Sequence, residues 1–294
     1  MPQTVSKADD DFPDTGGGVA IISGRGALPR LVAEACAERR INYRVVGFEG
    51  AAPGWAAAHP FIPAVIEKVG KLFSDIRQAG CSSITFAGGM ARPRLNPLRL
   101  DGKGIKVAAA MLPAMKQGDD ATLRKLAATV EAEGFTVIAP HEFLGSLVAP
   151  PGVLGRHEPT AEDRADAERA AAIVAALGAV DVGQAAVVAQ GICLATESIQ
   201  GTDRMLAFVA DTAAAFRPDP KGAGGVLFKA PKPGQDRRVD FPAIGPDTVR
   251  AAAGAGLAGI AVEAGGVLVL GLGETVSEAD RLGLFLWGRR GAGT

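Results

Sequence analysis

The stretch VAIISGRGALP at residues 19–29 combines a short apolar run, a glycine turn and the start of a helix. Four consecutive apolar residues, Val19 to Ile22, predict a buried strand. Ser23 to Gly26 forms the turn that follows. Pro29 suits the first turn of the next helix, because the N–H that proline lacks would have no partner there. This pattern indicates the first strand and helix of an α/β sheet.

The alternation of strands and helices continues to about residue 140. Further strands are predicted at residues 43–48, 65–66, 83–87 and 136–139, and helices at 29–39, 71–79, 105–116 and 121–133. Strands that alternate with helices indicate parallel βαβ units. The sequence therefore predicts an α/β protein whose N-terminal domain is Rossmann-like with a parallel sheet.

The second half of the chain has a less regular pattern. Helices are predicted at residues 161–177, 202–216, 246–255 and 276–286, and strands at 186–189, 192–195, 225–229, 259–262 and 267–270. Thr202 is the predicted N-cap of its helix. This half is expected to form a mixed α/β C-terminal domain.

Composition places the boundaries between these parts. The first 18 residues are polar and acidic, so we expect a disordered N-terminal extension and no signal peptide. Residues 149–160 have the proline and glycine content of a linker. The predicted organisation is an extension at 1–18, a Rossmann-like nucleotide-binding domain at 19–148, the linker, and a mixed α/β catalytic and lipid-binding domain at 161–294.

Charge and cysteine content exclude several classes of protein. The net charge is −1 from 31 basic and 32 acidic residues, so we expect no nucleic-acid partner. The three cysteines are far apart and form no CxxC motif, which argues against a disulfide framework or a cysteine zinc site. Residues 251–273 are apolar but contain seven glycines, which a membrane-spanning helix would not.

Two glycine turns follow predicted strands of the first domain. Gly24, Arg25 and Gly26 lie where backbone N–H groups and a helix N-terminus can meet a phosphate. Gly88 and Gly89 end another strand and should face the same edge of the sheet. Tight turns alone are the alternative explanation for these glycines.

A nicotinamide cofactor is a second interpretation of the first turn. Glu49 follows the second strand, where dinucleotide-binding folds keep an acid for the ribose. However, Pro29 replaces the third glycine of the GxGxxG motif. An NAD(P)-dependent oxidoreductase therefore remains an alternative, as does a non-catalytic protein that binds a nucleotide or a lipid.

Polar segments elsewhere supply further candidates. Asp119 and Thr122 lie at a helix start, where an aspartate is often an N-cap. Glu197, Thr202 and Asp203 lie between a strand and a helix. The loop KAPKPGQDRRVD at residues 229–240 holds four cations and two acids between prolines. Cations can bind a pyrophosphate and a carboxylate can hold Mg²⁺, although a surface ion-pair cluster is the structural alternative.

The sequence resembles the LpxI type of UDP-2,3-diacylglucosamine pyrophosphatase. The resemblance rests on residues 22–29, 179–184, 196–197, 201–203 and above all 229–240 with 242–245, and it spans about residues 19–287. It implies a two-domain enzyme of lipid A synthesis, with the substrate between the domains. Such an enzyme hydrolyses UDP-2,3-diacylglucosamine to 2,3-diacylglucosamine 1-phosphate (lipid X) and UMP with Mg²⁺ as cofactor.

The resemblance also implies residue roles. Asp236 matches the essential aspartate of the family, and we expect it to hold Mg²⁺ or to orient water. Lys229 and Arg237 are the other predicted catalytic residues, because cations can neutralise charge on a pyrophosphate. The predicted substrate-binding residues are Gly24, Arg25, Gly26, Lys71, Gly88, Gly89, Asp119, Thr122, Glu197, Thr202, Asp203, Lys232 and Gln235.

An acylated substrate sets the expected partners and location. We expect a cytoplasmic enzyme that makes transient, peripheral contact with the inner face of the inner membrane. We also expect a homodimer. The acylated UDP-glucosamine substrate and the lipid X product are the predicted ligands.

Overall fold

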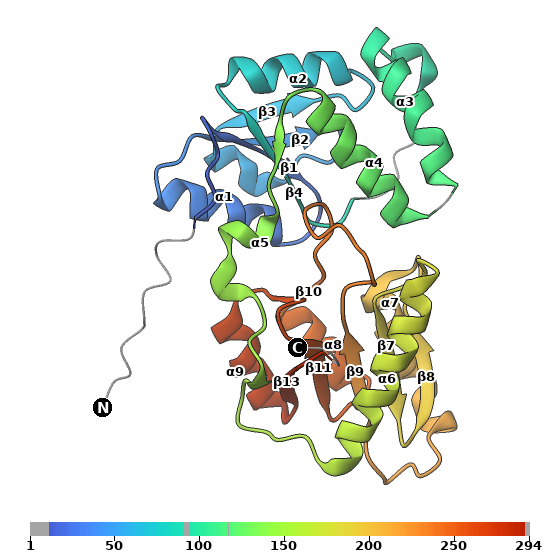
Figure 1. Ribbon diagram of the computed structural model, residues 1–294. Helices are drawn as coiled ribbons and strands as arrows, with labels where there is room; N and C mark the ends of the chain where they lie inside the picture. Colours follow the sequence, from blue (N-terminus) through green and yellow to red (C-terminus); the bar gives the residue numbers. More distant parts are fainter. Residues whose placement is uncertain (1–11, 91–94, 117, 292–294) are drawn as a thin grey trace. The chain divides into compact units, whose positions relative to one another are not determined.

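The computed structural model describes residues 12–90, 95–116 and 118–291, which divide into two compact units. Unit 1 comprises the described residues up to Ser146 together with Asp236–Asp240, and unit 2 comprises Leu147–Gln235 and the chain from Phe241 onward (Figure 1). The segment 236–240 therefore belongs to unit 1 although the sequence on both sides of it belongs to unit 2.

Unit 1 is built on a parallel sheet in the order β3-β2-β1-β4-β5. Its strands are β1 (Val19–Ser23), β2 (Tyr43–Phe48), β3 (Phe61–Ala64), β4 (Ser83–Ala87) and β5 (Thr136–Val137). β2 and β4 pair with opposite sides of β1. The chain order therefore reverses beside β1, which is the place where open α/β sheets bind ligands.

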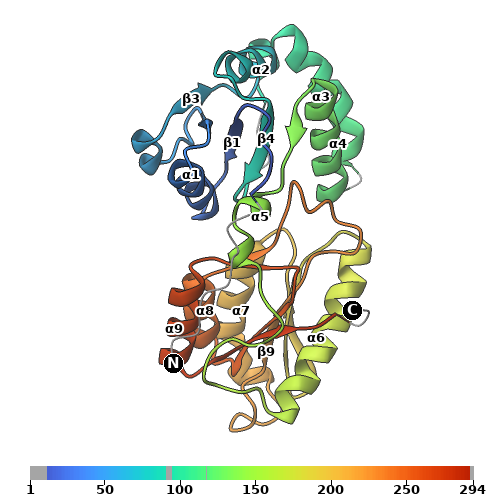
Figure 2. The same cartoon turned by 60° about the vertical axis from the view of Figure 1, so that its left-hand side comes forward.

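Helices cover both faces of this sheet (Figure 2). Unit 1 contains α1 (Leu28–Glu38), α2 (Val69–Gln78), α3 (Gly102–Met115), α4 (Asp119–Ala132) and α5 (Pro140–Phe143), with short 3₁₀ turns η1 (Gly54–Ala58), η2 (Pro97–Arg99) and η3 (Gly145–Leu147). Side chains of α2 and α4 pack in one core with alternate residues of β1 and β4, and α1 contacts β1, β2 and β4. Val239, from the segment 236–240, is buried in the same core as α2 and α4.

Unit 2 is built on a mixed sheet in the order β6-β13-β11-β9-β7-β8. Its strands are β6 (Gly152–Val153), β7 (Ala185–Ala189), β8 (Ile192–Thr196), β9 (Val226–Lys229), β11 (Gly259–Glu263) and β13 (Phe285–Arg289). The central strands β13, β11 and β9 are parallel, and β6, β7 and β8 are antiparallel to their neighbours. A separate parallel pair joins β10 (Ala243–Ile244) to β12 (Leu268–Val269). The predicted mixed α/β class is confirmed.

This sheet also has helices on both of its faces (Figure 2). α6 (Ala161–Ala179) packs with Val188, Val226 and Phe228. α7 (Gly201–Phe216), α8 (Pro246–Gly254) and α9 (Leu272–Leu282) enclose the larger core on the opposite face. In the described part of the chain, no helix has both the length and the apolar character needed to cross a membrane.

Three local predictions were wrong. The strand expected at 65–66 lies earlier, at Phe61–Ala64, where the edge position of β3 tolerates an exposed Pro63. The helix expected at 276–286 is α9 followed by β13, because Gly283 ends α9 with a φ of 76°. Thr202 lies inside α7 rather than at its N-cap, which is Gln200.

The predicted extension and linker have the following structure. Residues 1–11 lie outside the described part of the chain. Within residues 12–18, the carbonyl of Thr15 accepts hydrogen bonds from the hydroxyls of Ser82 and Ser83 at 2.9 and 3.0 Å, and Phe12 packs edge-on against Phe143. Residues 149–160 include β6, which pairs with β13.

Candidate functional site

The two glycine turns of unit 1 pack directly on each other at the carboxyl ends of β1 and β4. The N–H of Gly24 donates to Ala87 at 2.8 Å, and Arg25 and Gly89 exchange two backbone hydrogen bonds. A Cβ at Gly24 would lie 2.5 Å from the carbonyl oxygen of Gly88. Loop packing thus accounts for Gly24, and its N–H and that of Arg25 already have carbonyl partners.

Gly26 and Gly88 differ in what surrounds them. Both have positive φ, 90° and 84°. A Cβ at Gly88 would lie 2.3 Å from the carbonyl oxygen of Arg25, whereas a Cβ at Gly26 would meet no atom within 4 Å. Gly26 therefore marks open space at the N-terminal end of α1, which is the part of this turn that a ligand can approach.

The start of α4 lies beside the segment 236–240 within unit 1. Asp119 and Asp120 occupy the first turn of α4, where the helix dipole favours negative charge, and the N-cap is Gly118. The hydroxyl of Thr122 donates to the carbonyl of Gly118 at 2.7 Å. The N–H of Asp236 lies 3.4 Å from Oδ1 of Asp120. The structure therefore brings two of the predicted segments together around Asp236.

Asp236 forms a two-pronged ion pair with Arg238. Nε of Arg238 donates to Oδ1 at 3.0 Å and Nη2 donates to Oδ2 at 2.7 Å. The N–H of Arg238 also donates to Oδ1 at 3.0 Å, and its third guanidinium nitrogen pairs with Glu131. These hydrogen bonds from Arg238 are the main reason why the pKa of Asp236 lies below its usual range. The carboxylate is only 15% exposed and is ionised at neutral pH.

The residues around Asp236 suit a magnesium ion that is bound partly by protein carboxylates and partly by substrate phosphates. Asp236 and Asp120 offer carboxylate oxygens, the donors that Mg²⁺ prefers. Among the described residues, no group of three or more His, Cys, Asp or Glu side chains could enclose a metal. Mg²⁺ commonly takes one or two carboxylates together with substrate phosphates. The donor set fits this arrangement and does not fit a closed protein cage.

Arg237 and His141 are close in unit 1. Burial lowers the pKa of His141, and the positive charge of Arg237 adds to this effect. Arg237 itself is exposed. His141 is therefore neutral at physiological pH, and Arg237 presents a cation directly after Asp236 in the chain.

In unit 2, Lys229 ends β9 and is almost fully buried. It is 8% exposed. Its Nζ donates to Oγ1 of Thr202 at 2.9 Å and to the carbonyl of Ala243 at 3.2 Å. The hydroxyl of Thr202 donates onward to Oε2 of Glu197 at 2.6 Å. The structure thus joins three of the predicted residues in one hydrogen-bonded row, with the lysine charge held by neutral oxygens.

Lys232 and Gln235 fix the loop that follows β9. The N–H of Lys232 donates to Oε1 of Gln235 at 2.8 Å. The ammonium of Lys232, 9% exposed at the side chain, pairs with Asp181 at 2.5 Å. Asp203 lies in the first turn of α7 and is exposed. Lys232 and Gln235 therefore have structural partners within unit 2.

Lys71 and Glu49 are surface residues with partners of their own. The ammonium of Lys71 pairs with Asp75 at 2.6 Å, one helical turn away. Glu49, considered above for a ribose, pairs with Arg99 at 2.6 Å. In the described part of the chain, no hydrogen bond or ion pair joins either residue to the glycine turns.

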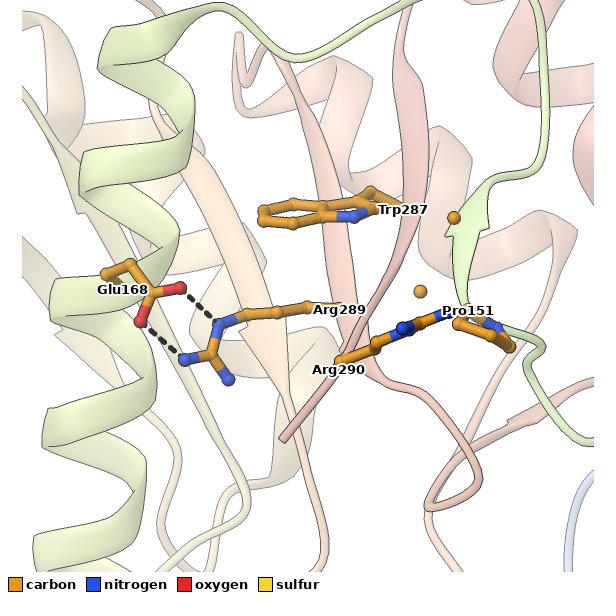
Figure 3. A pocket seen from close by; sticks show the side chains of 7 residues that line it. Pro151, Glu168, Trp287, Arg289 and Arg290 are labelled. Carbon is orange, nitrogen blue, oxygen red and sulfur yellow. Dashed lines mark hydrogen bonds and ion pairs between the residues drawn. The ribbon is translucent and has the colours of Figure 1, made fainter. Parts of the chain in front are cut away.

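A separate pocket of about 360 Å³ lies at the β6–β13 edge of unit 2 (Figure 3). Pro151, Trp287 and Arg290 line it, and Arg289 is paired with Glu168 at its side. No predicted site residue lines this pocket. Arg164 lies 4.8 Å from the ring of Trp287, so the aromatic ring already has a cationic neighbour.

The structure adds residues that the sequence did not single out. Arg238 lies in the loop 229–240 and Asp120 lies between the predicted Asp119 and Thr122, but only the fold shows that they contact Asp236. Glu131 is 107 residues from its partner Arg238. A sequence signal existed for Arg238, as a cation two residues from the key acid. None existed for Glu131, because its position on α4 is set by tertiary packing.

These features define a two-unit α/β protein with groups suited to a phosphorylated ligand. A Rossmann-like unit carries glycine turns and an ionised aspartate, and a mixed α/β unit carries a buried lysine. Comparison with known families divides the chain near the same point, between residues 147 and 150, although the segment 236–240 falls within the C-terminal family model. The LpxI N-terminal domain matches residues 18–147, and the LpxI C-terminal domain matches residues 150–287. The chain belongs to the LpxI family.

A named relative extends the comparison over nearly the whole chain. The chain is 40% identical over 270 residues to UDP-2,3-diacylglucosamine pyrophosphatase LpxI of Caulobacter vibrioides, covering 92% of this chain and 96% of the relative. Among solved structures, the crystal structure of isoflavone reductase aligns with 94% of this chain and 78% of its own, at 12% identity and a TM-score of 0.29. A likeness at that score carries no argument about fold or function.

Proposed function

We propose that the protein hydrolyses the pyrophosphate of UDP-2,3-diacylglucosamine to 2,3-diacylglucosamine 1-phosphate and UMP, with Mg²⁺, in lipid A synthesis. The observation that carries this proposal is the 40% identity to a pyrophosphatase of that substrate over 92% of the chain. Family membership favours this function over an NAD(P)-dependent oxidoreductase. The pairing of Glu49 with Arg99 also gives that acid a structural explanation.

Asp236 is the proposed metal ligand rather than a general base. A carboxylate with a lowered pKa is a weak proton acceptor at neutral pH. Asp236 and Asp120 would hold Mg²⁺ together with substrate phosphate oxygens. When bound, the ion neutralises charge on the pyrophosphate and stabilises the leaving phosphate. Arg238 keeps Asp236 ionised and fixes its orientation.

The cationic residues are proposed to bind phosphate oxygens. Lys229 has three N–H donors, and the described contacts use two of them. Its charge is buried among neutral oxygens, so an anionic ligand would be held strongly there. Arg237 supplies a second, exposed cation. Thr202 and Glu197 orient the ammonium of Lys229 through their hydrogen bonds.

Turnover of the proposed substrate tests this function directly. The purified protein is incubated with UDP-2,3-diacylglucosamine and Mg²⁺, and the products are followed by phosphorus NMR and mass spectrometry. We expect UMP and 2,3-diacylglucosamine 1-phosphate, and no products in excess EDTA. Tight binding without turnover would favour a non-catalytic lipid-binding protein. Full turnover in EDTA would contradict the metal requirement.

Assembly and location complete the proposal. We propose a homodimer, whose mass can be measured by light scattering at several protein concentrations. We also propose that the enzyme works at the cytoplasmic face of the inner membrane, where its acylated substrate resides. Fractionation of cells followed by detection of the protein in the membrane and soluble fractions tests this location.

A further inference from the structure

The outer side of α3 exposes large apolar side chains. Leu98, in η2 just before α3, is 95% exposed, and Ile105 and Leu112 on α3 are 56% and 59% exposed. Ile105 and Leu112 are seven residues apart and therefore share one face of the helix. Figures 1 and 2 both show α3 at the outer edge of unit 1. α3 packs against α2 and α4.

Two lysines lie beside these apolar side chains: Lys106 follows Ile105, about 100° further around the helix axis, and Lys116 is the C-cap of α3. Lys106 and Lys116 are both exposed. Lys116 follows Ile105 by eleven residues, which returns it to nearly the same helical direction. In the described part of the chain, no ion pair involves either lysine, whereas the neighbouring Lys103 pairs with Glu133. Leu98, Ile105, Leu112, Lys106 and Lys116 are called the α3 face below.

An anionic bilayer surface suits this combination better than a second copy of the chain. Apolar side chains beside lysines are typical of helices that lie in a membrane interface, where the lysines meet anionic headgroups. A symmetric dimer contact through the α3 face would place the lysines of both copies on one patch. Like charges brought together in this way oppose association.

We infer that the α3 face docks on the surface of an anionic phospholipid bilayer. The inference extends the proposed function, because an acylated substrate lies in a bilayer that the enzyme must reach. Docking would insert Leu98, Ile105 and Leu112 at the level of the headgroups, with Lys106 and Lys116 beside the lipid phosphates. It requires no substrate in the membrane and can be measured without turnover.

Vesicle sedimentation tests the inference with the full-length protein. Vesicles contain 30 mol% phosphatidylglycerol in phosphatidylcholine, or phosphatidylcholine alone, and no substrate. We expect binding to the anionic vesicles and much weaker binding to the neutral ones. Leu98→Ser with Leu112→Ser should lower the affinity at least about tenfold. Lys106→Gln with Lys116→Gln should lower it roughly twenty-five-fold, about fivefold for each charge.

Matched variants in unit 2 provide the control. Phe208 and Phe216 are 52% and 62% exposed on α7, and Phe208→Ser with Phe216→Ser should bind vesicles as the parent does. Equal binding by the parent and both α3 variants would overturn the inference. A parent dimer that becomes monomeric in the Leu98→Ser, Leu112→Ser variant would also overturn it, since the face would then be a contact between copies.

Activity measurements separate docking from the proposed function. On a short-chain, water-soluble substrate analogue, the α3 variants should turn over at the parental rate. On vesicle-embedded substrate they should be slower, by about the loss in vesicle affinity. An equal loss on both substrates would overturn docking, because α3 would then line the substrate site. A parent that binds vesicles but hydrolyses neither substrate would refute the proposed function and leave the docking result intact.

Discussion

Unit 1 carries a paired aspartate and unit 2 a buried lysine, and the two units hold these opposite charges differently. In unit 1, the Asp236 carboxylate is paired on both oxygens with Arg238. In unit 2, the Lys229 ammonium is buried with hydroxyl and carbonyl partners. The charge of Asp236 is neutralised by Arg238, whereas the Lys229 ammonium contacts neutral oxygens in the described part of the chain.

This difference separates two roles. A carboxylate held ionised by an arginine is ready to bind a cation, so Asp236 should affect the rate of the chemical step. A buried cation with neutral partners gains most from an arriving anion, so Lys229 should affect substrate binding. The glycine turns differ again, since Gly24 and Gly88 serve loop packing and Gly26 faces open space.

Replacement of Asp236 should have the largest effect. Asp236→Ala should lower kcat by about 10²–10⁴-fold, the range for loss of a group that acts in the transition state. Its pair with Arg238 is partly exposed, so the variant should lose no more than about 1 kcal/mol of stability. Steady-state kinetics and thermal melting measure both. Asp240→Ala, four residues on, is the control and should be milder; retention of more than about a tenth of parental kcat in Asp236→Ala would remove the catalytic assignment.

Substitutions in the two glycine turns should differ in their effect on the stability of the fold rather than on the rate of catalysis. Gly88→Ala places a Cβ 2.3 Å from the carbonyl of Arg25 at a φ of 84°, and should lower the free energy of unfolding by about 3 kcal/mol. Gly26→Ala has the same backbone strain without a clash, and should cost about 1 kcal/mol. Urea unfolding of both variants measures these two losses in the free energy of unfolding. Equal losses would mean that the two turns do not pack as described.

Lys229 should act mainly on binding. Lys229→Met removes a charge-assisted hydrogen bond to the substrate, and should lower kcat/KM about 10–100-fold, chiefly through KM. Lys71→Met removes a lysine from a surface pair and should change kcat/KM less than about twofold. A loss confined to kcat in Lys229→Met would show that the lysine acts in the chemical step instead.

Replacement of Arg238 should have the smallest effect of these changes, and that effect is on the pH dependence of the free energy of unfolding. The pKa of Asp236 is lowered chiefly by Arg238, so their pair stabilises the fold above about pH 4, the ordinary aspartate value. That stability is lost as the pH falls through the lowered pKa. Arg238→Met should remove less than about 1 kcal/mol at pH 7, because Arg238 is nearly half exposed. Urea unfolding at pH 7 and pH 3 measures the difference.

A matched change isolates the Arg238 pair. Glu131→Gln leaves the Asp236 pair in place, so the difference in unfolding free energy between pH 7 and pH 3 should stay close to that of the parent. In Arg238→Met this difference should shrink. If Arg238→Met kept the parental difference in unfolding free energy between pH 7 and pH 3, another group would hold Asp236 ionised.

The strands of the two sheets differ in how well the sequence predicted them. β1 and β4 are buried along their whole length and each ends at a glycine turn, and this pattern predicted both strands. β13 was missed because Phe285 and Leu286 continue the apolar pattern of α9, and only the left-handed Gly283 separates them. Asp236 could be singled out from the sequence because its motif resembles that of the LpxI family. Its surroundings could not be predicted, since tertiary packing brings Asp120 of α4 to Asp236 and Glu131 of α4 to Arg238.

The magnesium dependence of hydrolysis by Asp236→Asn tests the central claim most directly. The measurement is the Mg²⁺ concentration that gives half-maximal kcat, for the parent and for the variant. If Asp236 holds the ion, the half-saturating concentration should rise at least about tenfold, and activity should recover in part at high Mg²⁺, because the amide oxygen is a weaker ligand. An unchanged half-saturating concentration with a reduced kcat would contradict the claim and make Asp236 a base.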